Sequence, residues 1–319
     1  MSNNPIIMED YFNPGFKTKP AVHVGSQTIR FFRGSPKEQA WEGFFLSGIF
    51  DNDVIVVRDL DQNYIKYWEN LVEGVKIVNL VGLDKGKFLT EIILENPYIV
   101  DSIKRQMAYG SRLMVFHQSE LEEKLANAFG ISLHGSVRIS ELYGTKSGIR
   151  KLAKEFDLIM PRGFVCSTYF QVKKAISDLK DSFDNVIIKH DSSLSGYFSK
   201  KMAIDNIGNL REILDKISGG KFTEGKDIVV VEGWVKSKTV LGAHIEILGN
   251  KDPIICAGWQ QIIDSDGISY MGAGPLMLSS KALKSFITQV NKLAKALKDK
   301  GAVGSYGPDY IVASEEETN

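Results

Sequence analysis

The sequence predicts an α/β protein of two domains. Three observations support this: the length of the chain, the alternation of short β-branched runs with helical patterns, and a change of pattern near residue 143. A chain of 319 residues can hold two hydrophobic cores, since a domain commonly takes about 100–200 residues. Hydrophobic residues are 43% and charged residues 24% of the chain, as in ordinary globular proteins. We expect a first domain over 1–135 and a second over 143–319.

The first domain has the rhythm of a small α/β sheet. Residues 1–35 are predicted to be irregular apart from a short strand near Thr28–Phe32, and apolar residues recur at the helical period over Pro36–Ile49. Ser119 caps a helix whose first turn is rich in glutamate, which the helix dipole favours. The other expected elements are strands at Asp53–Arg58, Val75–Leu80 and Arg112–His117, a helix at Gln62–Val72, helices within 87–107, and the Ser119 helix ending at Gly130.

The second domain begins with a capped helix and continues with longer strands. Thr145 is the expected cap, and Ser167 or Thr168 caps the next helix. The expected helices are Lys146–Phe156, Phe170–Leu179, Gly208–Ile217 and Lys281–Lys300. The expected strands are Gly163–Cys166, Asn185–His190, Lys200–Ile204, Asp227–Glu232, Val240–Leu248, Pro253–Ile263 and Ser305–Ala313. The segment Tyr270–Pro275 is predicted to be a glycine-rich turn.

Charge and hydropathy exclude several classes of partner. Lys and Arg number 39, as do Asp and Glu, so no net charge draws the chain toward nucleic acid or an anionic membrane. No apolar run approaches the ~18 residues of a membrane span, and the N-terminus lacks a basic region followed by an apolar core. Cys166 and Cys256 lie in apolar stretches without a metal or redox spacing. We expect a cytoplasmic protein, and a homodimer stays open.

A serine-rich loop is the first candidate for chemistry. In VIIKHDSSLSGYFSKKM, residues 186–202, one strand ends at Lys189 and another leads out. Small residues let backbone N–H groups approach an anion, serine hydroxyls add donors, and lysine supplies a point charge. This favours phosphate binding by Lys189 and the loop that holds Ser192, Ser193, Ser195 and Gly196. A hairpin with a polar turn is the alternative, because the loop has one glycine.

Three further segments flank this loop, one upstream and two downstream. Upstream, YGTKSGIRKL leads Lys146 into a helix that ends before the turn Met160–Gly163. Downstream, VVVEGWV runs a buried strand into Glu232, and GAVGSYGPDYIV leads to Asp309. In this order the four segments resemble the ATP-grasp superfamily, over residues 143–319.

The resemblance implies an architecture and an activity. The architecture is a Rossmann-like pre-ATP-grasp domain followed by a two-lobed ATP-grasp domain, with lobes at about 143–232 and 233–319. The activity is ATP-dependent ligation of a carboxylate to an amine through an acyl-phosphate intermediate. Among the members of the superfamily, the sequence resembles most the peptide-forming amide ligases that carry a pre-ATP-grasp domain. ATP and Mg²⁺ would be the cofactors, and a small-molecule carboxylate and an amine or peptide the substrates.

The resemblance also implies roles for single residues. Lys146 and Lys189 would bind the phosphates, and Lys189 would act on the transferred phosphoryl group. The loop with Ser192, Ser193, Ser195 and Gly196 would fold over the triphosphate, Glu232 would accept from the adenine amino group, Trp234 and Val235 would line the base, Thr239 would contact ribose, and Asp309 would be a Mg²⁺ ligand. Each has a plainer alternative: a solvated lysine for Lys146, the end of an edge strand for Glu232, a turn residue for Asp309.

The sequence departs from the family pattern in two places. No acid follows the hinge where ribose is often held, so Thr239 or the later Glu246 would have to substitute. The family also places a Glu-x-Asn pair opposite the aspartate, and only Glu317-Thr-Asn319 offers one here. The tail after Ser314 has little to hold a strand, so we expect the domain to be C-terminally incomplete. Two rivals follow: an ATP-binding regulatory or degenerate protein without turnover, and a non-catalytic α/β interaction module.

Overall fold

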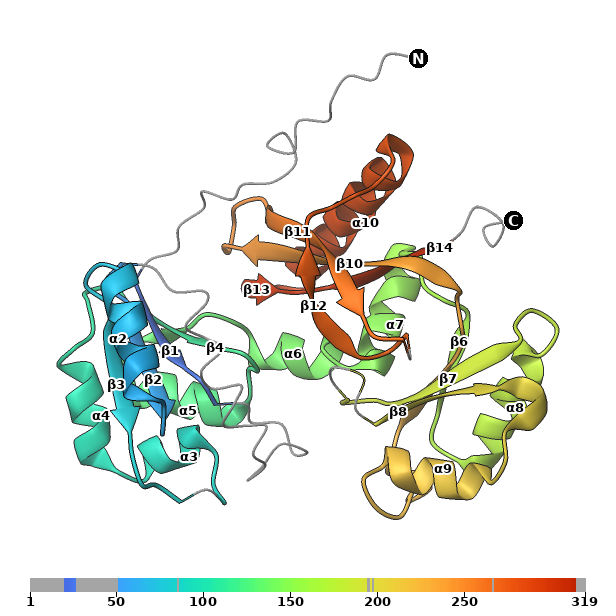
Figure 1. Cartoon of the computed structure of the whole chain (residues 1–319), viewed down its shortest axis with the longest axis horizontal. Coiled ribbons are helices and arrows are strands. Elements are labelled where there is room, and N and C mark those ends of the chain that lie inside the picture. Colours follow the sequence, from blue (N-terminus) through green and yellow to red (C-terminus); the bar gives the residue numbers. More distant parts are fainter. Residues whose placement is uncertain are drawn as a thin grey trace. The chain divides into compact units, whose positions relative to one another are not determined.

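A computed structural model describes residues 20–26, 51–84, 86–193, 196, 198–265 and 267–313. The strand expected at 28–32 and the helix expected at 36–49 lie outside the described residues, as do Ser195 and Glu317. The chain divides into two compact units, Gly15–Ser140 and a second that takes in Glu141–Asn319 (Figure 1). Parallel and antiparallel sheets with covering helices confirm the α/β class.

The first unit is built on a five-stranded parallel sheet in the order β3-β2-β1-β4-β5. Its strands are β1 (Ala21–Val24), β2 (Val54–Arg58), β3 (Lys76–Leu80), β4 (Arg112–Val115) and β5 (Ser132–Leu133). Its helices are α2 (Gln62–Leu71), α3 (Leu89–Leu94), α4 (Pro97–Lys104) and α5 (Glu120–Phe129). Apart from β1 and β5, these elements confirm the prediction to within a few residues. Ser119 caps α5 as predicted, and its hydroxyl accepts a hydrogen bond from Leu121 N.

The central strand β1 corrects the prediction of an irregular arm before residue 35. Only four residues long, it carries His23, whose polarity interrupts the apolar pattern. His23 Nε2 lies 3.0 Å from Asp53 Oδ2, and Asp53 Oδ1 accepts from Ala21 N at 2.8 Å. A buried polar group is stable when it is hydrogen-bonded, so this pair holds a strand that hydrophobic periodicity alone does not reveal.

Helices cover both faces of this sheet. On one face, α3, α4 and α5 pack over alternate residues of the central strands, among them Val22, Val54 and Leu113. On the other face, Ile55 and Val57 pack against Trp68 of α2 (Figure 1). The alternation of the strand side chains between two apolar faces is typical of a parallel sheet.

Helix α6 (Val137–Tyr143) contains the boundary between the two units, which follows Ser140, and α7 (Lys146–Phe156) is the next helix of the second unit. Thr145 caps α7 as predicted, accepting from Gly148 N at 3.0 Å. An antiparallel sheet follows in the order β6-β9-β7-β8, formed by β6 (Gly163–Cys166), β7 (Asn185–His190), β8 (Ser199–Ala203) and β9 (Val229–Gly233). The 3-10 turn η3 (Ile204–Asn206) follows β8, and α8 (Tyr169–Leu179) and α9 (Leu210–Ile217) cover one face of the sheet.

A second antiparallel sheet completes this unit, in the order β12-β11-β10-β13, with β14 also paired to β10. Its elements are β10 (Ser237–Ile247), β11 (Ile254–Ile263), β12 (Tyr270–Gly274), β13 (Gly304–Tyr306) and β14 (Asp309–Ala313), and α10 (Ser280–Asp299) packs on it. The predicted turn at Tyr270 is wrong, because this glycine-rich segment pairs with β11 as a strand. The single strand predicted over Ser305–Ala313 is divided by Gly307-Pro308, where proline cannot donate to the ladder.

No helix of the part of the chain that the structure describes is long and apolar enough to cross a membrane.

Candidate functional site

Lys189 and Glu232 meet on one face of the first antiparallel sheet. Glu232 of β9 is paired with Ile187 of β7, and Lys189 lies two residues further along the same strand. Residues two apart in a strand share a face, so both side chains project on the face opposite the α8–α9 core. Lys189 Nζ donates to Glu232 Oε2. Glu232 is only 6% exposed. The hydrogen bond between Lys189 and Glu232 shows that the structure brings together the two residues that the sequence placed at the centre of the site.

Arg150 is a third member of this cluster that the sequence analysis missed. Its Nη2 lies 3.1 Å from Glu232 Oε1 and donates to the Pro161 carbonyl oxygen at 2.6 Å. Gly163 leaves the room for this contact, since a Cβ there would stand 2.5 Å from Arg150 Nη2 and 2.6 Å from the Val231 carbonyl oxygen. The available signal was a second cation one helical turn after Lys146 on α7.

Two cations decide the charge of Glu232. Burial by itself would raise the pKa of the carboxyl group, because a charge is poorly solvated in the protein interior. The charge and hydrogen bond of Lys189, and then those of Arg150, outweigh burial and hold the pKa below its ordinary value. Glu232 is therefore an ionised, acceptor-only group at neutral pH.

Lys146 faces the serine-rich loop from the start of α7. Its Nζ donates to the Ser193 carbonyl oxygen, and its backbone N–H donates to the Asp191 carbonyl oxygen at 3.1 Å. Ser147 binds the Asp191 carboxylate twice, through N at 2.7 Å and Oγ at 3.0 Å. Asp191 thus ties the helix start to the loop, a role that the sequence analysis did not assign.

The Lys146 amine lies in a crowded electrostatic environment. Burial, followed by the charge of Lys189, lowers its pKa to about 8. Asp191, Glu232 and Asp309 act in the opposite direction. The groups that act on this amine come from both antiparallel sheets, Glu232 from β9 and Asp309 from β14.

The serine-rich loop is described in part. Ser192 is exposed, whereas Ser193 is buried and its hydroxyl donates to the His190 carbonyl oxygen at 2.9 Å. Gly196 has φ +77°, and a Cβ there would stand 2.7 Å from Ile268 Cγ2. Glycine fits this position because it tolerates a positive φ and a close neighbour.

Trp234, Val235 and Thr239 follow Glu232 at the passage between the two sheets. Lys201 Nζ lies 4.1 Å from the centroid of the Trp234 ring, and Trp234 N donates to Asn185 O at 2.8 Å. Trp234 lines a cavity of about 230 Å³. The other residues lining it are Lys180, Asp181, Ser182, Phe183, Asp184, Asn185 and Lys236. Val235 and Thr239 are half-buried.

Asp309 begins β14 on the second sheet, opposite Gly242 of β10. Gln261 Nε2 donates to Asp309 Oδ1 at 2.5 Å. The side chain is exposed, but the protein around the carboxyl group desolvates it enough to raise its pKa, although Gln261, Lys189 and Lys146 act in the opposite direction. Among the described residues, no three His, Cys, Asp or Glu side chains form a ready group for a metal ion.

The later Glu246 is held in a separate polar cluster. It is 1% exposed, accepts from the Ser305 hydroxyl, and its Oε1 lies 3.0 Å from His244 Nε2. Its carboxylate is therefore committed to these partners, which leaves Thr239 as the ribose candidate of the two considered.

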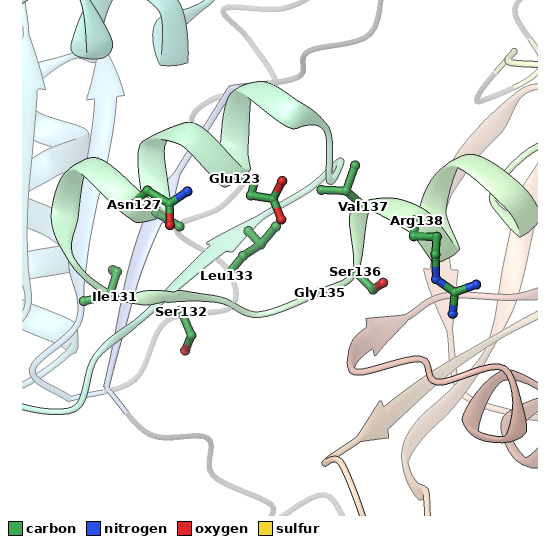
Figure 2. Close-up of a pocket in the computed structure, with 10 residues that line it drawn as sticks. Glu123, Asn127, Ile131, Ser132, Leu133, Gly135, Ser136, Val137 and Arg138 are labelled. Atoms are coloured by element: carbon green, nitrogen blue, oxygen red, sulfur yellow. The ribbon is translucent and has the colours of Figure 1, made fainter.

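A larger cavity, of about 330 Å³, belongs to the first unit (Figure 2). Glu123 and Asn127 of α5 line it together with the residues around β5 and the start of α6. None of the predicted site residues lines it.

Comparisons with known proteins connect this arrangement to solved structures. No protein-family model and no curated protein matches the sequence. In structure, the chain is similar to a biotin carboxylase in complex with β,γ-ATP from Campylobacter jejuni, at a TM-score of 0.63 and 13% identity, over 93% of this chain and 63% of that one. It is also similar to an N5-carboxyaminoimidazole ribonucleotide synthetase in complex with ADP, at a TM-score of 0.58 and 11% identity, over 96% and 68%.

A third likeness is to D-alanyl-alanine synthetase A from Vibrio cholerae, at a TM-score of 0.57 and 12% identity, over 94% of this chain and 86% of that one. The chain therefore spans about two thirds of the length of the first two structures and most of the third. Identities this low show the fold alone. The three structural likenesses confirm the ATP-grasp fold that the order of the four sequence segments predicted.

Proposed function

Starting from this ATP-grasp fold, we propose that the chain binds MgATP and uses it to join a carboxylate to an amine. One observation carries the proposal: Lys189 of β7 is ion-paired with the buried Glu232 of β9, and Lys146 of α7 donates to the Ser193 carbonyl oxygen in the loop that follows β7. Two cations that could hold phosphate and one buried acceptor thus lie on the first sheet and its loop, and the charge of Asp309 on the second sheet acts to raise the pKa of Lys146. A surface of unrelated charges would not gather these types from elements so far apart in sequence.

Lys146 and Lys189 are the phosphate ligands of this proposal. Both are held by internal partners, the Ser193 carbonyl and the Glu232 carboxylate, so each would exchange that partner for a phosphate oxygen. The burial that lowers the Lys146 pKa to about 8 strengthens its interaction with an anion, because fewer water molecules screen the charge. The backbone of the loop at Ser192, Ser193, Ser195 and Gly196 would complete the cradle.

Asp309 is the residue that would hold Mg²⁺. Mg²⁺ is commonly bound through one or two carboxylates together with substrate phosphates, so a single exposed carboxylate beside the two lysines fits it. When bound, the ion would offset charge on the phosphate oxygens. Gln261 would orient the carboxylate through its hydrogen bond.

The proposed chemistry needs no side-chain nucleophile. A carboxylate oxygen of the substrate attacks the γ-phosphorus, and ADP leaves; the amine then attacks the acyl carbon, phosphate leaves, and the amine gives up a proton. Lys189 would offset charge on the transferred phosphoryl group. The two cysteines fit this account, because burial raises the pKa of Cys166 to about 11 and that of Cys256 to about 12, so both remain thiols.

Calorimetric titration with MgATP tests the proposal. We expect the wild type to bind, and Lys189→Ala to weaken binding at least about 30-fold, because a charged partner of phosphate is lost. Lys200→Ala is the matched control. Lys200 is exposed on the adjacent strand β8 and is paired with Ile188, so its side chain projects from the face of the sheet opposite to that of Lys189. Absence of MgATP binding by the wild type would favour the interaction-module alternative and overturn the proposal.

A nucleotide-binding protein without turnover is the second candidate. The observation behind it is that, within the described ranges, Asp309 belongs to no group of three or more His, Cys, Asp or Glu side chains that could hold a metal ion. Phosphate release from MgATP, measured with the twenty common amino acids as acceptors and hydroxylamine as a trap, separates the two candidates. Release above the rate of Lys189→Ala supports the ligase; tight binding without release supports the regulatory reading.

A further inference from the structure

The two cations that contact Glu232 differ in exposure and in their other attachments. Lys189 reaches Glu232 Oε2 from the more open side, and its side chain is 26% exposed. Arg150 reaches Oε1 and is 14% exposed. Arg150 also donates to the Pro161 carbonyl oxygen at 2.6 Å, so the guanidinium has a second attachment besides Glu232, whereas the ammonium group of Lys189 is held by Glu232.

The difference matters when Lys189 leaves for a phosphate group. A buried carboxylate that loses its only cation is strongly destabilised. Arg150 remains in place at that moment, so Glu232 stays paired and ionised. An ionised carboxylate only accepts hydrogen bonds, which suits a base that presents an amino group and repels one that presents a carbonyl oxygen at the same position.

We propose that Arg150 is a positioning residue for nucleotide recognition: it holds Glu232 as a fixed, ionised acceptor, so that Glu232 selects adenine over guanine and Lys189 is released to the phosphates. This inference rests on the proposed function. Arg150 itself would not contact the nucleotide, and its effect would pass through Glu232. Gly163 is part of the same device, because its missing side chain is what admits the guanidinium.

Calorimetry with MgADP and MgGDP tests the inference on the full chain. The informative variant is Arg150→Gln, which removes the charge and keeps a donor for Pro161. We expect its MgADP affinity to fall about 10- to 100-fold, the range for losing a charged hydrogen bond to a buried group, and its ratio of MgADP to MgGDP affinity to fall about 10-fold. Arg150→Lys should recover most of the ratio, and Lys151→Met, an exposed neighbour on α7, should match the wild type.

A double-mutant cycle separates positioning from mere support of the fold. If Arg150 acts through Glu232, then Arg150→Gln should weaken MgADP much less in a Glu232→Gln background than in the wild type. Additive effects would overturn the inference. So would an unchanged ratio in Arg150→Gln, which stays measurable even if part of the protein unfolds, because both nucleotides titrate the same folded fraction. A wild type that binds neither nucleotide would instead overturn the proposed function.

Discussion

The two halves of the candidate site are built in opposite ways. In the first sheet of the second unit, Glu232 is buried and both of its oxygens are engaged, by Lys189 and Arg150. In the second sheet, Asp309 is exposed and accepts one hydrogen bond, from Gln261. The electrostatics differ accordingly: the pKa of Glu232 is lowered by its cations, whereas that of Asp309 is raised by desolvation.

Under the proposed function, this difference would separate a half of the site that is formed before the nucleotide binds from a half that the nucleotide completes. The charge of Glu232 is already balanced by protein, so its geometry belongs to the fold. The charge of Asp309 is only weakly compensated, which leaves it open to a cation brought with the phosphates. The same substitution should therefore have different consequences in the two halves.

The largest expected effect is on folding. Glu232→Ala leaves Lys189 and Arg150 partly buried without their counter-charge, and we expect it to lower the free energy of unfolding by about 3–5 kcal/mol, as for other broken buried pairs. Asp309→Ala removes an exposed group and should change it by less than about 0.5 kcal/mol. Chemical denaturation of both variants measures the contrast. Equal losses would mean that the two halves do not differ as their geometry indicates.

The next effect comes from filling the space beside Arg150. A Cβ on Gly163 would stand 2.5 Å from Arg150 Nη2, 2.6 Å from the Val231 carbonyl oxygen and 2.9 Å from Glu232 Cγ, so Gly163→Ala must displace both the guanidinium and the neighbouring backbone of β9. We expect a loss of about 1–3 kcal/mol in stability, as for other overpacked sites, together with weaker MgADP binding. Gly220→Ala is the control, since nothing lies within 4 Å of a Cβ there. If both variants behave alike, Arg150 does not depend on this gap.

A smaller effect should appear as acid dependence. The folded pKa of Glu232 lies below its ordinary value, so its ionised form stabilises the fold above the unfolded pKa, about 4.3. That stability is lost as the pH falls through the folded pKa. We therefore expect the wild type to lose stability below about pH 4.3 more steeply than Glu232→Gln. Melting temperatures from pH 3 to 7 test this, and parallel curves would contradict it.

The sequence predicted the parts of the site that depend on local chemistry. The bounds of α7, β6 and β7 agree with the prediction, because caps and turn residues at their ends act within a few positions. The ion pair of Lys189 and Glu232 was not predicted, because the sequence analysis assigned Lys189 to phosphate and Glu232 to adenine; the structure shows the contact. The strand β1 was missed because a paired histidine interrupts its pattern.

The supporting residues could not be predicted in the same way. Arg150 is 82 positions from Glu232, Ser147 is 44 from Asp191, and Gln261 is 48 from Asp309. Apart from the position of Arg150 one helical turn after Lys146, no local pattern marks these partners, because their contacts depend on how sheets and helices pack. Only the three-dimensional arrangement reveals which cation stays with Glu232 and which amide holds Asp309.

The smallest expected effect concerns the exposed half. Gln261→Ala removes the side-chain hydrogen bond from Gln261 to Asp309, which frees the carboxylate to rotate without disturbing the fold. We expect unchanged stability and a rise of about 2- to 10-fold in the Mg²⁺ concentration for half-maximal ADP binding, as for one lost hydrogen bond. Gln260→Ala is the matched control, since Gln260 is paired with Leu241 rather than with Val240 and projects from the other face of β11. A titration of ADP binding with Mg²⁺ measures both variants. If Gln261→Ala matches Gln260→Ala, the metal ion is not held through Asp309 as oriented by Gln261, and the exposed half of the site would have to be sought elsewhere on the second sheet.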